Sequence, residues 1–387
     1  MAPLLYLDTA RLGQMKPAAK DGQLDFVRLS SEEPSSLYFE QFLRDGFSAW
    51  PDSYQKRFPG LRTWTGVSGL KRSIRQLVKA PDDWQVLLAN RSLSLVHLAS
   101  NCMFRVCRNV LTTDLSWPTY QQAIEVRACH TGNRVATVPL REDILYYGWT
   151  AADVASYLAN AFIEHQCDGL FLPAVDHLGI RLPIRDIVEQ IQHRSELRFC
   201  FVDAAQAFCH IPLDDCIEFA DFIVAGSHKW MGAYLPTGIG LFGQRESREM
   251  IGHHLKNAVQ IGQIEDPLLH FTEQLDSGDL DGHSETANLT SIFACAGAAF
   301  DQMAERQGLQ STVPLPVDQW AEEIPRPSTD WYLRRPDTPF QSRIALFESH
   351  NPELKQVCPE VIRRIWLDSG CIVTGYPDSR TRVSLPL

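Results

Sequence analysis

The chain has 387 residues, of which 44% are apolar and 21% are charged, and its formal net charge is −11. This is the composition of a globular protein large enough for two domains. The negative charge argues against nucleic acid and anionic membrane surfaces as partners, and no apolar run approaches the about 18 residues that span a bilayer.

The N-terminal residues and the cysteines predict where the protein resides. The start, MAPLLYLDTARLGQMK, has no basic segment before its short apolar run, so we expect no signal peptide. The ten cysteines are scattered without CxxC pairs, which favours free thiols in a reducing cytoplasm. The acidic stretch 276–285 fits no strong metal-binding spacing, and we expect a solvated loop there and no metal site.

The first hundred residues alternate between strand-like and helical patterns. A short strand is expected at 4–7 and ends in a turn at Gly13. Apolar residues at helical spacing predict helices over 37–50 and 66–80. The apolar run Trp84–Ala89 predicts a buried strand.

A helix is predicted to follow this strand, from Leu95 towards Arg105, with serines at its start. The N-terminus of such a helix is a ready phosphate site, because its free N–H groups and its dipole favour an anion. Ser92 or Ser94 can equally be an ordinary helix cap, and on this stretch alone the capping role is favoured.

The alternation continues and defines a fold class. Further strands are predicted at 109–113, 134–140 and 170–174, and helices at 151–164, with Thr150 as its cap, and at 184–194. This pattern predicts a largely parallel α/β sheet with functional loops at the carboxyl ends of its strands. Trp117, just after one of these strands, either packs in the core or stacks on a flat cofactor ring.

The stretch from Asp203 to Gly240 carries the strongest chemical signal. Two apolar runs, Phe199–Val202 and Phe222–Ala225, read as short buried strands. Asp203 follows the first, and Lys229 lies shortly after the second. Pyridoxal 5′-phosphate (PLP) requires such a pair: the lysine forms a Schiff base with its aldehyde, and the acid keeps its pyridine nitrogen protonated.

The last third of the chain predicts a change of domain. A long helix is expected over 288–306, followed by a proline-rich connection, and residues 340–387 form a small α+β unit. We therefore expect an N-terminal arm (1–30) that packs with the small domain, a large PLP-binding α/β domain (31–310) and a small C-terminal α+β domain (311–387).

Several segments, in chain order, resemble the class V aminotransferase superfamily of fold-type I PLP enzymes, which includes cysteine desulfurases, isopenicillin N epimerase-like proteins and kynureninase. They are YLDTARLG (6–13), LLANRSLSLVHLA (87–99), LTTDLSWPTY (111–120), LPAVDHLGIRLPI (172–184), FVDAAQAFCHIPLD (201–214), AGSHKWMGAYLPTGIGLF (225–242), SETANLTSIFACAGA (284–298) and RTRVSL (380–385). The resemblance implies a large domain with a mostly parallel seven-stranded sheet and a small α+β C-terminal domain.

The resemblance also implies a role for individual residues. Lys229 would be the catalytic Schiff-base lysine, and Arg382 would bind the substrate carboxylate with Ala10 and Arg11 nearby. Asp203 would pair with the pyridine nitrogen, and Gln206 would reach the phenolic oxygen. The cofactor-binding residues implied are Ser92, Leu93, Trp117, Asp176, Asp203, Ala205, Gln206, Ser227, His228, Lys229 and Thr286. Thr286 would reach the phosphate bound by a partner subunit, which predicts a homodimer with active sites at the interface.

The chain departs from the family pattern at four of these places. Trp117 is the candidate to stack on the ring where desulfurases use a histidine, and Asp176 stands where the family often has asparagine. Gly226 replaces a phosphate-binding serine, with Ser227 displaced by one position, and Leu93 replaces a threonine.

We therefore predict a PLP-dependent enzyme that acts on a small-molecule amino-acid substrate through an aldimine and a Cα carbanion, with lysine as acid and base. We favour lyase or side-chain replacement chemistry, and the departures suggest a substrate of specialised metabolism; an aminotransferase or an epimerase are the alternatives. A cysteine desulfurase is disfavoured, because Cys371 enters a strand and the loop 375–380 contains no cysteine. A non-catalytic PLP-fold binding protein is a further alternative, against which the set Asp203, Gln206, Lys229 and Arg382 argues.

Overall fold

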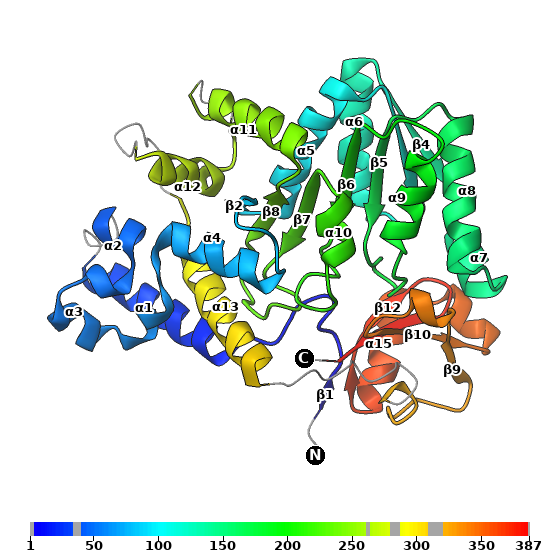
Figure 1. Cartoon of the computed structure of the whole chain (residues 1–387). Helices are drawn as coiled ribbons and strands as arrows, with labels where there is room; N and C mark the ends of the chain where they lie inside the picture. The colour runs from blue at the N-terminus through cyan, green and yellow to red at the C-terminus, as the bar shows by residue number, and fades with distance from the viewer. Residues whose placement is uncertain (1–3, 34–39, 261–263, 279–286, 309–319, 386–387) are drawn as a thin grey trace.

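The fold is described from a computed structural model over residues 4–33, 40–260, 264–278, 287–308 and 320–385. Its centre is a seven-stranded sheet of strand order β2-β8-β7-β6-β5-β3-β4 (Figure 1). The strands are β2 (Gln85–Ala89), β3 (Asn109–Thr113), β4 (Arg134–Val138), β5 (Gly169–Pro173), β6 (Phe199–Asp203), β7 (Phe222–Gly226) and β8 (Gly238–Phe242). β8 alone among these seven runs antiparallel to its neighbours. The predicted mostly parallel seven-stranded sheet is confirmed.

Helices cover both faces of this sheet. They are α1 (Pro17–Glu32), α2 (Glu40–Asp45), α3 (Asp52–Arg57), α4 (Gly66–Leu77), α5 (Ser92–Val106), α6 (Pro118–Thr131), α7 (Arg141–Tyr146), α8 (Ala151–Glu164), α9 (Ile184–Gln192), α10 (Asp214–Phe219), α11 (Arg245–Gln260), α12 (Pro267–Ser277) and α13 (Thr290–Gly308). Successive residues of β2 alternate between two cores: Val86 and Leu88 belong to the core that includes α4, α8, α9 and α13, whereas Leu87 and Ala89 belong to the core that includes α5, α6 and α11. Strands β5, β6 and β7 are buried at every position, as expected of a sheet covered on both faces.

A smaller unit follows the large one and lies beside it (Figure 1). Its antiparallel sheet has the order β12-β13-β10-β9 and packs with helix α15 (Pro359–Asp368). The strands are β9 (Trp331–Arg334), β10 (Ile344–Ser349), β12 (Thr374–Tyr376) and β13 (Arg380–Ser384). Trp331, Phe347 and Trp366 form the centre of its separate core.

The N-terminal residues divide between these two units. Strand β1 (Leu5–Tyr6) pairs in parallel with β11 (Cys371–Ile372) of the small unit. Helix α1 instead lies along α13 of the large unit. The arm expected over 1–30 thus contacts the small domain only through its first part.

Small residues allow α1 and α13 to approach closely. A Cβ added at Gly297 would lie 2.2 Å from the backbone oxygen of Ala18, and one at Gly22 would lie 3.1 Å from that of Phe293. The small-residue run of α13 therefore has a structural function, because a larger side chain would force the two backbones apart.

Two helices, α11 and α12, lie in a polar segment for which the sequence pattern predicted no helix. α11 and α12 occupy much of 243–280, and α12 begins with Asp266, whose carboxylate accepts from the N–H groups of Leu268 and Leu269. The helix expected over 37–50 is shorter, with α2 and one turn of 3₁₀-helix at Phe47–Ala49 within the described part. No helix in the described ranges is long and apolar enough to cross a membrane.

The close approach of α1 and α13 gives a first prediction. Gly297→Ala should lower the free energy of unfolding by about 1–3 kcal/mol, because the new methyl group meets backbone that must move. The matched control is Gly252→Ala in α11, where a Cβ would meet nothing within 4 Å. It should be neutral or stabilise by up to about 1 kcal/mol, since alanine is the better helix former. Denaturant unfolding measures both, and equal effects of the two substitutions would contradict the packing argument.

Candidate active site

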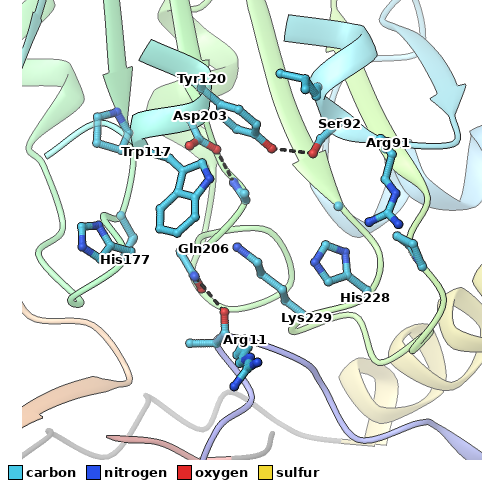
Figure 2. A pocket seen from close by; sticks show the side chains of 18 of the residues that line it. Arg11, Arg91, Ser92, Trp117, Tyr120, His177, Asp203, Gln206, His228 and Lys229 are labelled. Carbon is cyan, nitrogen blue, oxygen red and sulfur yellow. Dashed lines mark hydrogen bonds between the residues drawn. The ribbon is translucent and has the colours of Figure 1, made fainter. Parts of the chain in front are cut away.

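A cavity of about 690 Å³ opens at the carboxyl ends of the parallel strands. Residues that follow β3, β5, β6 and β7 line it, together with the start of α5, residues 10 and 11, and residues of β12 and β13. Parallel strands bring their carboxyl ends to one edge of a sheet, which is why side chains distant in sequence meet here. Figure 2 shows the convergence, with Lys229 near its centre.

Lys229 lies in the loop after β7, with its amine in the cavity. The pKa of this amine is lowered to about 8, chiefly by burial; the charge of Asp203 opposes the shift and that of Arg382 adds to it. An amine with such a pKa is partly neutral near pH 7 and can act as a nucleophile or base. The loop is held by the N-terminal segment, where the N–H of Gly13 donates to the oxygen of His228 at 2.8 Å.

Asp203 is the last residue of β6 and faces the same cavity. Its Oδ1 accepts from the N–H of Ala205 at 2.8 Å. Burial raises the pKa of the carboxyl to about 6, while this hydrogen bond and Lys229 act in the opposite direction. Burial of a carboxylate without a cation in direct contact costs free energy. A protonated ring nitrogen beside Asp203 would offset this cost, and the carboxylate would in turn favour the protonated form of the nitrogen.

The opposite side of the cavity fits a phosphate. Ser92 and Leu93 begin α5, whose first N–H groups face the cavity, and the hydroxyls of Ser92 and Tyr120 are hydrogen-bonded to each other. His228 Nδ1 and Thr237 Oγ1 are buried there without a hydrogen-bond partner. Such orphaned polar atoms beside a helix N-terminus are satisfied when an anion is bound. The residues present therefore fit the phosphate of PLP.

Arg382 stands at the other end of the cavity and is only 3% exposed. Its Nη2 lies 3.1 Å from Oδ1 of Asp8 and 3.2 Å from Oγ1 of Thr374, and its Nη1 donates to the oxygen of His177 at 3.1 Å. The buried Nε has no partner. The guanidinium is thus fixed in place and keeps a donor for a carboxylate.

The remaining predicted residues are placed as follows. Gln206 donates from Nε2 to the oxygen of Ala10 at 2.8 Å and accepts at Oε1 from the indole of Trp230 at 3.1 Å. Trp117 is 44% exposed and projects over the cavity, with its ring edge-on to His177. The cavity brings together the predicted residues Ala10, Arg11, Ser92, Leu93, Trp117, Asp176, Asp203, Ala205, Gln206, His228, Lys229 and Arg382.

One predicted residue, Ser227, is not among those that line the cavity. The hydroxyl of Ser227 donates to the oxygen of Leu235 and accepts from the N–H of Thr237, so it stabilises the loop. It therefore does not substitute for the serine that the resemblance led us to expect at position 226. Thr286 lies outside the described residues.

Sequence reasoning missed Arg91, Tyr120, His177 and Thr237, which also line the cavity. Tyr120 is one helical turn beyond Trp117, and His177 directly follows Asp176. Their closeness in sequence to predicted residues could have identified them as part of the site.

Comparison with known proteins places this geometry in a family. The sequence model of "Aminotransferase class-V" matches residues 63–304. A probable cysteine desulfurase of Pasteurella multocida (strain Pm70) is 31% identical over 96 residues, which are 24% of this chain and only 22% of the relative. The chain thus spans about a fifth of the length of the curated relative that it matches.

Solved structures agree over nearly the whole chain. A complex of the cystine C-S lyase C-DES with cysteine persulfide has a TM-score of 0.67 at 13% identity and covers 100% of this chain and 93% of its own. A NifS-like protein has a TM-score of 0.64 at 11% identity and covers 99% and 94%. The phosphoserine aminotransferase SerC of Cytophaga hutchinsonii has a TM-score of 0.64 at 13% identity and covers 100% and 94%.

The fold and the cavity define a fold-type I PLP transferase architecture. The chain belongs to the aminotransferase class-V family. It is a PLP-dependent enzyme, and members of this family act on small amino-acid substrates.

The buried carboxyl of Asp176 gives a prediction for pH dependence. Burial raises its pKa from 3.8 to about 6, so the folded protein binds this proton more tightly than the unfolded chain. Stability that comes from the protonated form is therefore lost as the pH rises from about 4 to above 6. Relative to Asp176→Asn, the cofactor-free protein should lose about 3 kcal/mol of unfolding free energy over this range.

Denaturant unfolding at a series of pH values tests this. Asp186→Asn on the exposed face of α9 is the matched control, and its difference from the wild type should stay flat. A flat difference for Asp176→Asn as well would show that Asp176 has an ordinary pKa.

Proposed function

We propose that this protein is a PLP-dependent lyase or side-chain-replacement enzyme that acts on an amino acid. The observation that carries the proposal is the amine of Lys229, with its lowered pKa, in one cavity with Asp203 and the buried Arg382. The three groups provide a base, a partner for a ring nitrogen and a carboxylate site.

PLP supplies an electron sink that stabilises negative charge at the substrate Cα. Lys229 would bond to its aldehyde, Asp203 would hold the pyridine nitrogen, and Ser92, Leu93 and His228 would hold its phosphate. Trp117 projects over the space between them and would stack on the ring.

The protein's own residues would carry out the proton transfer. Arg382 would orient the amino acid by its carboxylate, using the Nε donor that Asp8 and Thr374 leave unused. The amine of Lys229 would accept the proton from the substrate Cα and return it. Its pKa of about 8 is close to neutral, which suits a group that both accepts and returns a proton.

The placement of the cysteines argues against a desulfurase. Cys371 is fully buried in β11, and its thiol contacts the backbone oxygen of Pro325. Burial raises the pKa of this thiol, which disfavours the nucleophilic thiolate. All ten cysteines lie in the described ranges, and none lines the cavity. Aminotransfer and epimerisation share the first proton transfer and remain the competing reactions.

We also propose that the enzyme is a homodimer in the cytoplasm, with Thr286 of one subunit at the phosphate of the other. This rests on the family resemblance and on the cysteine usage. Sedimentation equilibrium of the holoenzyme tests the assembly, and a monomer would overturn it.

A prediction for Lys229 tests PLP attachment. The purified wild type should be yellow, and borohydride should fix the cofactor to the chain. Lys229→Ala should lose this covalent link, because no amine of comparable pKa remains in the cavity. Lys20→Ala, on the exposed face of α1, is the control and should keep the wild-type absorption. A colourless wild type that takes up no added PLP would overturn the enzyme assignment.

The reaction itself is tested with a panel of amino acids. We expect a 2-keto acid together with ammonia and a released side-chain group, without accumulation of the pyridoxamine form of the cofactor. A keto acid with the pyridoxamine form would identify an aminotransferase, and inversion at Cα alone would identify an epimerase. Loss of sulfur release from cysteine in Cys371→Ser alone would restore the desulfurase.

A further inference from the structure

At one wall of the cavity, three buried polar atoms have no hydrogen-bond partner among the described residues. They are Oδ2 of Asp176, Nδ1 of His177 and Nε of Arg141. Nδ1 of His177 and Nε of Arg141 each lie 3.9 Å from Oδ2 of Asp176. Asp176 and His177 line the cavity, and Arg141 approaches from α7.

The other oxygen of Asp176 is fully occupied. Oδ1 accepts from the N–H groups of Leu178 at 2.9 Å and Ile180 at 2.8 Å, which fixes the carboxyl on its loop. The separations of 3.9 Å are too long for direct hydrogen bonds, and one further polar atom between the groups would bridge them. Three unsatisfied buried atoms around one point indicate a site for that atom, since leaving them unpaired is costly.

The cluster adjoins the carboxylate site. Nη1 of Arg382 donates to the backbone oxygen of His177 at 3.1 Å, so a substrate held by Arg382 lies next to these groups. The ring of His177 is held by Trp117 on one side and Tyr376 on the other, with ring centres 5.5 Å away in each case. Figure 2 shows His177 and Trp117 together on one side of the cavity.

The protonation states of the cluster are set by its surroundings. Burial raises the pKa of Asp176 to about 6; Arg141 and the N–H groups of its loop oppose this rise. Tyr376 of β12 also faces Asp176. The pKa of His177 is lowered to about 3, chiefly by burial and also by the charges of Arg141, Arg382 and Lys229, so its ring is neutral. Near pH 6, Asp176 therefore exchanges its proton readily, whereas His177 can only accept or donate a hydrogen bond.

We propose that Asp176, His177 and Arg141 form a subsite for the β-heteroatom of the amino-acid substrate, and that the Asp176 carboxyl gives this atom a proton when it leaves. The substrate class is an amino acid with a hydroxyl or thiol at Cβ. The proposal rests on the proposed lyase function and adds a second proton-carrying group to Lys229.

The proposed step balances as follows. Lys229 takes the proton from Cα, and the electron pair left behind becomes the second bond between Cα and Cβ. The bond from Cβ to the heteroatom breaks, and its electron pair leaves with the heteroatom. That atom takes the proton of Asp176 and departs as water or as hydrogen sulfide. Asp176 becomes a carboxylate, with the N–H of Arg141 close by, and regains a proton from solvent.

The test compares two leaving groups in the holoenzyme. A hydroxyl group needs a proton to leave, whereas the chloride of 3-chloro-L-alanine does not. Asp176→Asn should lower kcat for elimination from L-serine by about 100-fold or more, the range of general acid catalysis. With 3-chloro-L-alanine the decrease should stay below about threefold. Release of pyruvate measures both, and Asp186→Asn is the matched control that should change neither.

A readout without turnover checks that the variant is intact. Asp176→Asn should keep the visible absorption of bound PLP and its shift on addition of an unreactive amino acid such as 2-methylalanine. His177→Gln is the second variant: it keeps a hydrogen-bonding side chain without the ring and should lower the rate with L-serine more than the rate with 3-chloro-L-alanine.

The outcomes are separable. An equal decrease with both leaving groups, or no decrease with either, would overturn the role of Asp176 and leave the lyase function standing. A wild type that binds PLP but eliminates nothing, even from 3-chloro-L-alanine, would overturn the proposed function and this proposal with it.

Discussion

The buried ion pair between Asp8 and Arg382 joins the two ends of the chain at the cavity. Both side chains are under 10% exposed, and Thr374 donates its hydroxyl proton to Oδ1 of Asp8 as well. Removal of one partner from such a pair costs about 3–5 kcal/mol, because the other charge stays buried. The pair brings β1 and β13 to the mouth of the cavity, so the small domain and the N-terminal segment complete a site that the large sheet begins.

Burial in this cavity acts on acids and bases in opposite directions. The pKa of Lys229 falls towards 8, while the pKa values of Asp203 and Asp176 rise towards 6. The pKa values of all three groups are thereby shifted towards 7, where a side chain can both accept and donate a proton at low free-energy cost. A cofactor nitrogen at Asp203 would remove the cost of that carboxylate, whereas Oδ2 of Asp176 has no hydrogen-bond partner in the described part of the chain and only contacts of 3.9 Å with Arg141 and His177. This difference is why we assign Asp176 to the substrate.

The sequence predicted the elements that depend on local pattern. The strands before Asp203 and Lys229, and the capping of α8 by Thr150, follow from apolar runs and a polar residue at the right spacing, and the structure has them. It did not predict α11 and α12, whose apolar faces are dispersed among polar residues. The partnership of Asp176 with Arg141 joins residues 35 positions apart and depends on the sheet, so no local pattern reveals it. Thr286 at the partner's phosphate stays a prediction.

The departures from the family pattern are coupled in space. A Cβ at Gly226 would lie 3.2 Å from both Cε1 and Nδ1 of His228, so the imidazole occupies the space that a serine side chain would need. The absence of a side chain at Gly226 therefore allows the imidazole of His228 to take its present position. The ring nitrogen that results is buried and unpartnered, beside Thr237 and the start of α5. A histidine that burial keeps neutral can still donate one hydrogen bond, so His228 would offer an imidazole N–H to a bound phosphate where Gly226 offers no hydroxyl.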